Sequence, residues 1–297
     1  MQARLTAHPP AQAAIVATVR PGASLRIGRA ADCGLRIEHP SVSRAHAALV
    51  PDDLGWTLRD LRSKNGTFVN GERIDDDHPL RAPAWLRFGD VLCEFSLQDE
   101  AEAEAEAVVQ RKRRDAATAH TARIAGIERL DALLDASLRG VLELSDCTRG
   151  FVLLRAGDDF LVRASLALDA GALRDRGFSG SVGAVQRVLD AASTVVANDI
   201  SREAWLRERQ SVIASGLDAL VCVPLRDGEA VIGAIYADRT RPGTPLTTLD
   251  QELLEAFAER AALWIVARQA AAELDAAPPA PPSTAWRGIV AAHGSVP

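Results

Sequence analysis

The pattern of apolar and polar positions divides the chain into two halves. Over residues 13–98 apolar side chains alternate with polar ones in short runs, as at Val91, Cys93 and Phe95. A period of two is typical of strands that bury one face. Asn-Gly pairs between these runs supply tight turns. This half is predicted to be all-β, most simply a two-sheet sandwich.

The second half carries a helical period at both ends. Between about residues 116 and 146 apolar side chains recur at three- and four-residue steps, which predicts one long amphipathic helix. The later runs predict strands at 151–154, 160–166, 194–197, 220–225 and 231–236, and helices at 181–191, 202–214 and 249–274. This half is therefore predicted to be α+β, with long helices flanking the sheet.

A charged segment joins the two halves. Residues 99–106 are mainly acidic, and residues 111–114 are basic. This order suits the dipole of an exposed helix and allows salt bridges along it; a docking surface is the alternative. The predicted division is 1–12 as an N-terminal tail, 13–98 as the first domain, 99–119 as a helical linker, 120–274 as the second domain and 275–297 as a proline-rich tail.

Composition narrows the classes of function. The net charge of −6 over 297 residues argues against a general nucleic-acid or membrane-surface binder. No stretch approaches the roughly 20 apolar residues of a membrane helix, and the N-terminus has no apolar signal region. The four cysteines form no C-x-x-C pair, which is typical of a reducing compartment. We therefore expect a cytoplasmic protein without direct nucleic-acid or membrane contacts.

No catalytic constellation stands out, so we expect neither an enzyme nor a cofactor. Neither lysine follows the glycines of a phosphate-binding P-loop, and no G-x-S-x-G nucleophile motif occurs. The second domain has no histidine between Thr121 and Ala292, which excludes histidine-ligated haem and histidine-rich metal sites there. Cys147 and Cys222 are either buried inert thiols or redox sensors.

Residue types suited to phosphate binding occur in order along the first half. They are Gly28-Arg29, then Ser-Val-Ser-Arg-Ala-His at 41–46, then Ser-Lys-Asn-Gly-Thr at 63–67 and Asn-Gly at 70–71. Phosphothreonine carries nearly two negative charges and three acceptor oxygens. Arginine, hydroxyl and amide groups are its natural donors, and the end loops of a sandwich can present them together.

The order and spacing of these segments resemble the forkhead-associated (FHA) family over about residues 13–98. By this resemblance Arg29 and Ser43 bond the phosphate, Arg44 and Lys64 flank it, and Asn65 holds the peptide backbone. The structural positions implied are Gly28, His46 and Gly66. The implied partner is a phosphothreonine-containing protein, the substrate of a Ser/Thr kinase.

Residues 120–272 resemble the GAF family, a fold for small-molecule sensing and dimerisation. The resemblance lies in Ser-Thr-Val-Val-Ala-Asn-Asp at 193–199 and in the apolar runs at 219–225 and 231–238. The candidate ligand pocket consists of Phe178, Ser179, Asn198, Asp199, Trp205 and Cys222. The resemblance also implies a homodimer in which the long helices pair; alternatively, each helix covers the sheet of its own domain.

An FHA domain followed by a GAF domain is the arrangement of the regulatory half of some sigma-54-dependent transcriptional activators. Residues 286–290 are similar to the start of the ATPase domain that follows there. We therefore expect a phosphothreonine-dependent signalling module that regulates transcription, either a regulatory fragment or a free-standing adaptor. One alternative is a small-molecule sensor with the GAF pocket as its main input. Another is self-recognition of phosphorylated Thr118 or Thr121. Ile124 lies three residues after Thr121, a position that FHA domains often read.

Overall fold

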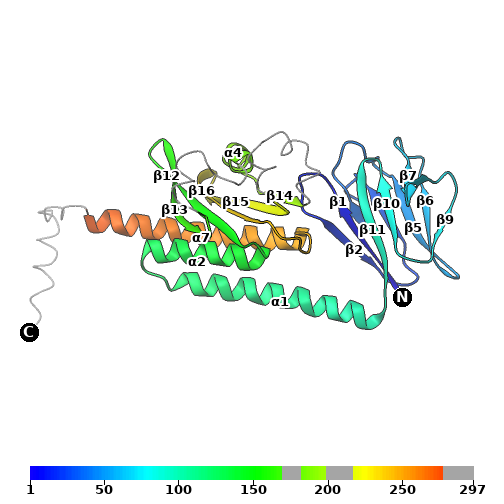
Figure 1. Cartoon of the computed structure of the whole chain (residues 1–297), viewed down its shortest axis with the longest axis horizontal. Helices are drawn as coiled ribbons and strands as arrows, with labels where there is room; N and C mark the ends of the chain where they lie inside the picture. Colours follow the sequence, from blue (N-terminus) through cyan, green and yellow to red (C-terminus); the bar gives the residue numbers. More distant parts are fainter. Residues whose placement is uncertain (169–181, 199–216, 277–297) are drawn as a thin grey trace, which may run out of the picture.

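The computed structural model describes residues 1–168, 182–198 and 217–276. An all-β domain lies at one end of the molecule and an α+β domain beside it, and one long helix runs beneath both (Figure 1). The fold class predicted from the sequence is confirmed.

The first domain consists of two packed sheets. The six-stranded sheet has the order β2-β1-β11-β10-β7-β8, with β1 (Gln2–His8), β2 (Ile15–Val19), β7 (Thr67–Val69), β8 (Glu72–Arg73), β10 (Ala84–Phe88) and β11 (Val91–Gln98). The five-stranded sheet has the order β4-β3-β5-β6-β9, with β3 (Leu25–Gly28), β4 (Leu35–Arg36), β5 (Ala47–Asp52), β6 (Gly55–Asp60) and β9 (His78–Leu80). Between the sheets lie fully buried side chains that include Trp56, Phe88 and Phe95.

The N-terminal residues differ from their expected role as a tail. Residues 2–8 form strand β1, which pairs with β2 on one side and with β11 on the other. Ala3, Leu5 and Ala7 alternate on the buried face of this strand. The domain therefore begins at residue 2 rather than at residue 13.

The expected linker and the first expected long helix also differ from the structure. Helix α1 (Glu100–Ala125) includes the whole charged segment and extends beyond it, and Asp99 closes a capping box with Glu102 at its start. Helix α2 (Leu130–Ser145) is separate. Helix α1 ends at Ala125, with Gly126 as its C-cap. The apolar period from 116 to 146 is therefore divided between two helices that pack on each other.

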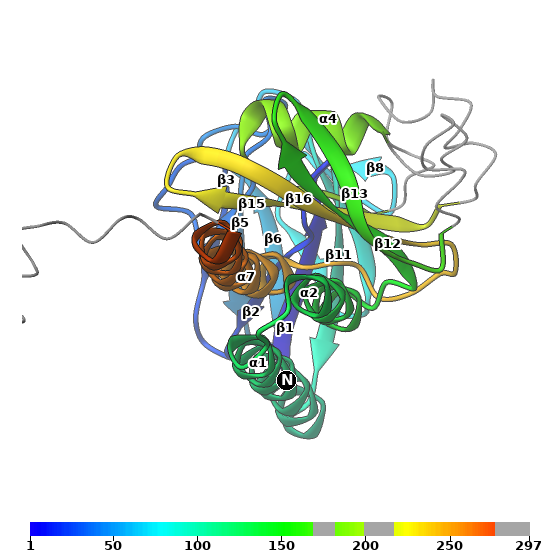
Figure 2. The ribbon, with the colours of Figure 1, turned by 90° about the vertical axis from the view of Figure 1, so that its left-hand side faces the viewer.

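The second domain is a five-stranded antiparallel sheet with helices on both faces. Its order is β13-β12-β16-β15-β14, with β12 (Arg149–Ala156), β13 (Asp159–Leu166), β14 (Val195–Asn198), β15 (Ala219–Asp227) and β16 (Ala230–Arg239). Helices α2 and α7 (Thr248–Ala276) cover one face, and α4 (Val182–Ala191) lies against the other (Figure 2). The helix expected at 202–214 lies outside the described residues.

The apolar faces of the long helices are buried within their own domain. Leu134, Leu138 and Val141 of α2 share a core with Phe257 and Ile265 of α7 and with the sheet beneath them. Of the two alternatives that the sequence left open, coverage of the domain's own sheet is the one that this packing supports. In the part of the chain that the structure describes, no helix is both long and apolar enough to cross a membrane.

Candidate functional site

Loops at one end of the sandwich form an open depression. It is lined by Arg29, Pro40, Ser41, Val42, Ser43, Arg44, Ala45, Lys64 and Asn65, and its volume is about 520 Å³. Arg29 directly follows β3, residues 40–45 precede β5, and Lys64 and Asn65 lie between β6 and β7. The structure thus brings together all five residues expected to bind the phosphopeptide.

Arg29 and Ser43 are oriented by hydrogen bonds to the backbone of this end of the domain. The Arg29 Nε–H donates to the Val42 carbonyl oxygen at 3.2 Å, and its backbone N–H donates to the Ser43 carbonyl oxygen at 2.9 Å. This geometry commits only Nε of the guanidinium, so its two terminal nitrogens can still donate. The Ser43 Oγ accepts the Lys64 N–H at 3.0 Å, which leaves its hydroxyl proton available for an anion.

Asn65 connects the two sides of the depression. Its Nδ2 donates to the Ser41 carbonyl oxygen at 2.7 Å. The Oδ1 atom and the second Nδ2 proton remain free to pair with a peptide backbone. Arg44 and Lys64 are both exposed at the rim, so the depression has an excess of positive charge. Such a set of donors suits a phosphate group.

His46 holds the loops from beneath. Its side chain is fully buried and lies edge-on to Phe88, with ring centroids 5.7 Å apart. The Nδ1 atom accepts the Ser43 N–H at 3.0 Å, so Nε2 carries the proton and donates to the Gly66 carbonyl oxygen at 3.2 Å. Burial lowers the pKa of His46, which favours this neutral form.

The two glycines predicted as structural have separate reasons. A Cβ at Gly28 would collide with the carbonyl oxygen of Arg44, so β3 can approach the loop at residues 40–45 only without a side chain there. Gly66 has a φ of +80°, a left-handed conformation that favours glycine.

Sequence reasoning missed two supporting residues, Ser41 and Asp60. The Ser41 Oγ accepts the Asp90 N–H at 2.9 Å, which fixes the β10–β11 turn against the depression. The Asp60 carboxylate accepts the hydroxyl groups of Ser63 and Thr67, each at 2.6 Å. Burial alone would raise the pKa of Asp60, but these hydrogen bonds hold it below its usual value. The sequence contains a signal for Asp60, because Ser63 and Thr67 lie in the segment at 63–67 and the resemblance assigns no partner to their hydroxyl groups.

Of the six candidate GAF pocket residues, the structure describes Asn198 and Cys222, and it does not bring these two together. Phe178, Ser179, Asp199 and Trp205 lie outside the described residues. Asn198 and Cys222 lie on opposite faces of the sheet, because Cys222 packs on the α4 side while Asn198 bonds Leu246, in the segment before α7. Cys222 is fully buried next to Tyr236, and burial raises the pKa of its thiol.

The two linker threonines lie on helix α1. The hydroxyl of Thr118 donates to the Arg114 carbonyl oxygen at 3.0 Å, and that of Thr121 to the Ala117 carbonyl oxygen at 2.9 Å. Both residues are therefore part of a regular helix, whereas the depression is open to an extended chain. Self-recognition would require this part of α1 to unwind.

The fold defines a two-domain protein, and the depression on its first domain is an open site lined by hydrogen-bond donors and positive charge. Family models identify each part: the FHA domain model matches residues 25–91, and the GAF domain model matches residues 129–265. The chain contains an FHA domain followed by a GAF domain.

The curated relatives match the first domain only. The ABC transporter ATP-binding/permease protein Rv1747 of Mycobacterium tuberculosis is 47% identical over 72 residues, which are 24% of this chain and 8% of that protein. The transcriptional regulatory protein EmbR of the same species is 40% identical over 63 residues, which are 19% of this chain and 16% of EmbR. The chain thus aligns with less than a fifth of either relative.

Solved structures resemble each domain separately. EmbR of M. tuberculosis in complex with a low-affinity phosphopeptide is 28% identical, covering 32% of this chain and 24% of that one, with a TM-score of 0.28. A GAF domain/HD domain protein from Geobacter sulfurreducens is 20% identical, covering 49% of this chain and 97% of that one, with a TM-score of 0.40.

Proposed function

We propose that this protein binds phosphothreonine-containing partners through the depression of its FHA domain. The observation that supports this is the convergence of Arg29, Ser43, Arg44, Lys64 and Asn65 around one open site. Arg29 supplies the fixed charge, Ser43 supplies a hydroxyl donor, and Asn65 is placed to pair with the peptide backbone. The partner is a substrate of a Ser/Thr kinase.

Binding to an immobilised phosphothreonine peptide library tests the proposal, with phosphoserine and unphosphorylated libraries as controls. Arg29→Ala removes one charged partner of the phosphate, which should cost roughly 2–5 kcal/mol and abolish detectable binding. Arg59→Ala is the matched control, because it removes an exposed arginine of the same domain that pairs with Asp77 and does not line the depression. Equal loss with both variants, or no preference for phosphothreonine, refutes the proposal.

The output of the module is proposed to be transcriptional regulation. EmbR, a transcriptional regulatory protein, is similar to this chain in the FHA region. The likeness to sigma-54-dependent activators rests on domain order and on residues 286–290, which lie outside the described residues. A pull-down with this protein as the bait tests the proposal. One arm uses cytoplasmic extract whose proteins have been phosphorylated by the kinase, and the other arm uses the same extract after dephosphorylation. Recovery of a transcription component only in the phosphorylated arm supports it.

The GAF domain is proposed to add a small-molecule input and a homodimer contact. Because the apolar faces of α2 and α7 are buried within the domain, a dimer contact would have to use exposed residues such as Leu263. Sedimentation of the full chain at micromolar concentration tests the dimer, and a monomer refutes it. A small molecule that copurifies with the chain and raises its melting temperature would favour the alternative in which the GAF pocket is the main input.

A further inference from the structure

The FHA and GAF domains meet at a narrow junction around Ala14. Its N–H donates to the Leu246 carbonyl oxygen at 2.8 Å, and its carbonyl oxygen accepts the Thr248 N–H at 2.9 Å. These bonds form a parallel β-bridge between the first hairpin of the FHA domain and the segment before α7. The preceding residue, Ala13, is buried within the core of the GAF domain. The two domains are thus joined by backbone bonds as well as by the covalent chain.

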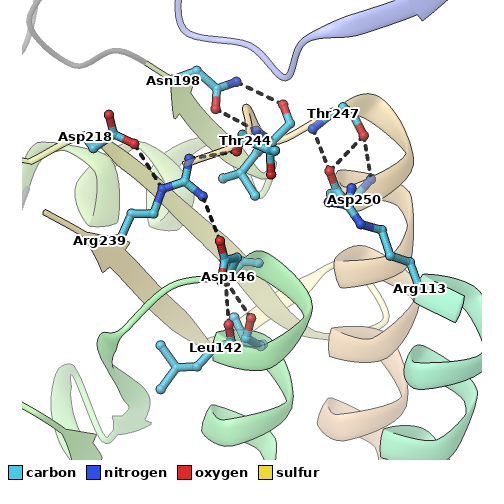
Figure 3. A network of polar contacts seen from close by, with 12 residues as sticks. Arg113, Leu142, Asp146, Asn198, Asp218, Arg239, Thr244, Thr247 and Asp250 are labelled. Carbon is cyan, nitrogen blue, oxygen red and sulfur yellow. Dashed lines mark hydrogen bonds and ion pairs between the residues drawn. The ribbon is translucent and has the colours of Figure 1, made fainter. Parts of the chain in front are cut away.

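Side chains of the GAF domain hold the other half of this junction in place. The Asn198 amide binds the Leu246 backbone at both groups: Nδ2 donates to its carbonyl oxygen at 2.9 Å, and Oδ1 accepts its N–H at 2.8 Å. Arg239 donates to the Thr244 carbonyl oxygen at 2.7 Å, and Asp250 accepts the Thr247 N–H at 2.8 Å. Figure 3 shows these side chains converging on the segment from the sheet and from α7. The Leu246 carbonyl oxygen therefore accepts hydrogen bonds from both Asn198 and Ala14.

The junction is flanked by hollow space. A cavity of about 450 Å³ is lined by FHA residues such as His8 and Trp85 and by GAF residues such as Asp218 and Pro245. A second cavity, of about 620 Å³, lies between the FHA sheet, α1 and the start of α7. Away from the junction the domains are connected through helix α1, which directly follows β11 and packs on α2 and α7. On the FHA side, Glu106 of α1 pairs with Arg4 at 3.0 Å and accepts a hydrogen bond from the Gln98 amide at 2.8 Å. The hydrogen bonds that run from Asn198 through Leu246 to Ala14 are therefore a second connection between the domains.

Asn198 also connects the junction to the rest of the GAF sheet. It is the last residue of β14, which is the edge strand among the strands that the structure describes and pairs there with β15. Val195, three residues earlier, pairs with Cys222 and packs on the α4 side. A change on the α4 face that shifts this edge strand would therefore move the Asn198 amide on the opposite face.

We propose that Asn198 is a latch between the two domains. While its amide holds Leu246, the phosphopeptide depression keeps one orientation relative to helix α7. A rearrangement of β14 releases Leu246 and frees that orientation. The regulatory role of the latch rests on the proposed phosphopeptide binding. If the depression holds a partner, the latch sets the orientation of that partner relative to helix α7.

Spin labels at Leu54→Cys and Leu274→Cys test the latch in the full chain. Both positions are exposed, and they lie on the FHA domain and on α7, while the four native cysteines are buried. Double electron–electron resonance should give one narrow distance distribution for the otherwise unchanged protein. Asn198→Ala should broaden it at least twofold or add a second population. Gln186→Ala is the matched control, because it removes an amide bond to Asp190 on the surface of α4 and should leave the distribution unchanged.

The latch is overturned by a distribution in Asn198→Ala that equals that of the parent. If Asn198→Ala does not fold, Asn198→Asp preserves the size but faces the Leu246 carbonyl with a carboxylate, and should broaden the distribution; a narrow one again overturns the proposal. Phosphothreonine peptide affinity is measured separately by calorimetry. A parent chain that binds no peptide but responds to Asn198→Ala refutes the proposed function and retains the latch.

Discussion

The backbone N–H of Ser43 donates to Nδ1 of His46 at 3.0 Å, so the loop at residues 40–45 depends on an unprotonated nitrogen. The same imidazole donates from Nε2 to the Gly66 carbonyl oxygen in the neighbouring loop. A second proton on the ring would remove the acceptor of Ser43. The architecture of the depression is therefore linked to the protonation state of a residue that no ligand is expected to touch.

This link predicts that the FHA domain loses stability in mild acid. Burial lowers the pKa of His46 below 6.5, so the unfolded chain takes up a proton at a higher pH than the folded one. The His46 contribution is present above about pH 6.5 and declines as the pH falls toward the lower folded value. Urea denaturation between pH 5.5 and 7.5 should show a falling free energy of unfolding. His46→Gln should be less stable than the parent and should show a flatter pH profile; a slope in His46→Gln equal to that of the parent would contradict the prediction.

Gly28→Ala should disrupt the depression without touching a ligand-binding side chain. The new Cβ would collide with the Arg44 carbonyl oxygen, so β3 or the loop at 43–44 must move. We expect a loss of about 1–3 kcal/mol in stability and at least tenfold weaker phosphopeptide binding. Gly126→Ala is the control, because nothing lies within 4 Å of its added Cβ. Thermal unfolding and peptide titration measure both effects, and unchanged peptide affinity in Gly28→Ala would contradict the prediction.

Arg113→Ala should weaken the contact between α1 and α7. The guanidinium of Arg113 pairs with Asp250 at 2.8 Å, and the Asp250 side chain is only 4% exposed. The substitution leaves this carboxylate without its cation, at a cost of about 1.5–3 kcal/mol in unfolding free energy. Arg111→Ala removes a neighbouring exposed charge and should change stability by no more than about 0.5 kcal/mol. If urea denaturation gives the same loss of unfolding free energy for both variants, the buried Asp250 carboxylate is not stabilised by Arg113.

Cys147 should behave as an inert thiol rather than a redox sensor. Burial raises its pKa from 9.0 to about 12, which at pH 8 reduces the thiolate fraction by about a thousandfold. Cys222 is fully buried, and its pKa is raised for the same reason. Both should react with a disulfide reagent at least a hundredfold more slowly in the native protein than in urea, as mass spectrometry of the labelled peptides would show. Rapid labelling of either in the native state would support a redox role.

The sequence predicted the alternating strands and the loop residues of the FHA domain because both signals are local. Arg29, Ser43 and Asn65 fall in short segments next to turns, and the sandwich then brings those segments to one end. Strand β1 was missed because its buried positions at Ala3 and Ala7 are small and give a weak apolar signal beside Leu5.

Other features depend on register and packing, which the sequence does not state. The helix break at Gly126 lies inside a continuous apolar period, so only the packing of α1 against α2 reveals it. Asn198 and Cys222 both fall in apolar runs, but the face that each occupies is set by the pairing of β14 with β15. Their assignment to one pocket could not be tested before that pairing was known.

The position of β1 has a consequence for how the protein is made. Ala3 pairs with Leu97, so the six-stranded sheet cannot close until almost a hundred residues have been synthesised. The GAF core, in turn, receives Ala13 from the hairpin that follows β1. During translation the first domain can fold before the second is complete, and its hairpin then offers a preformed edge against which the segment at 246–248 docks. A GAF fragment produced alone would lack that edge, so the order of synthesis and the order of assembly coincide in the intact chain.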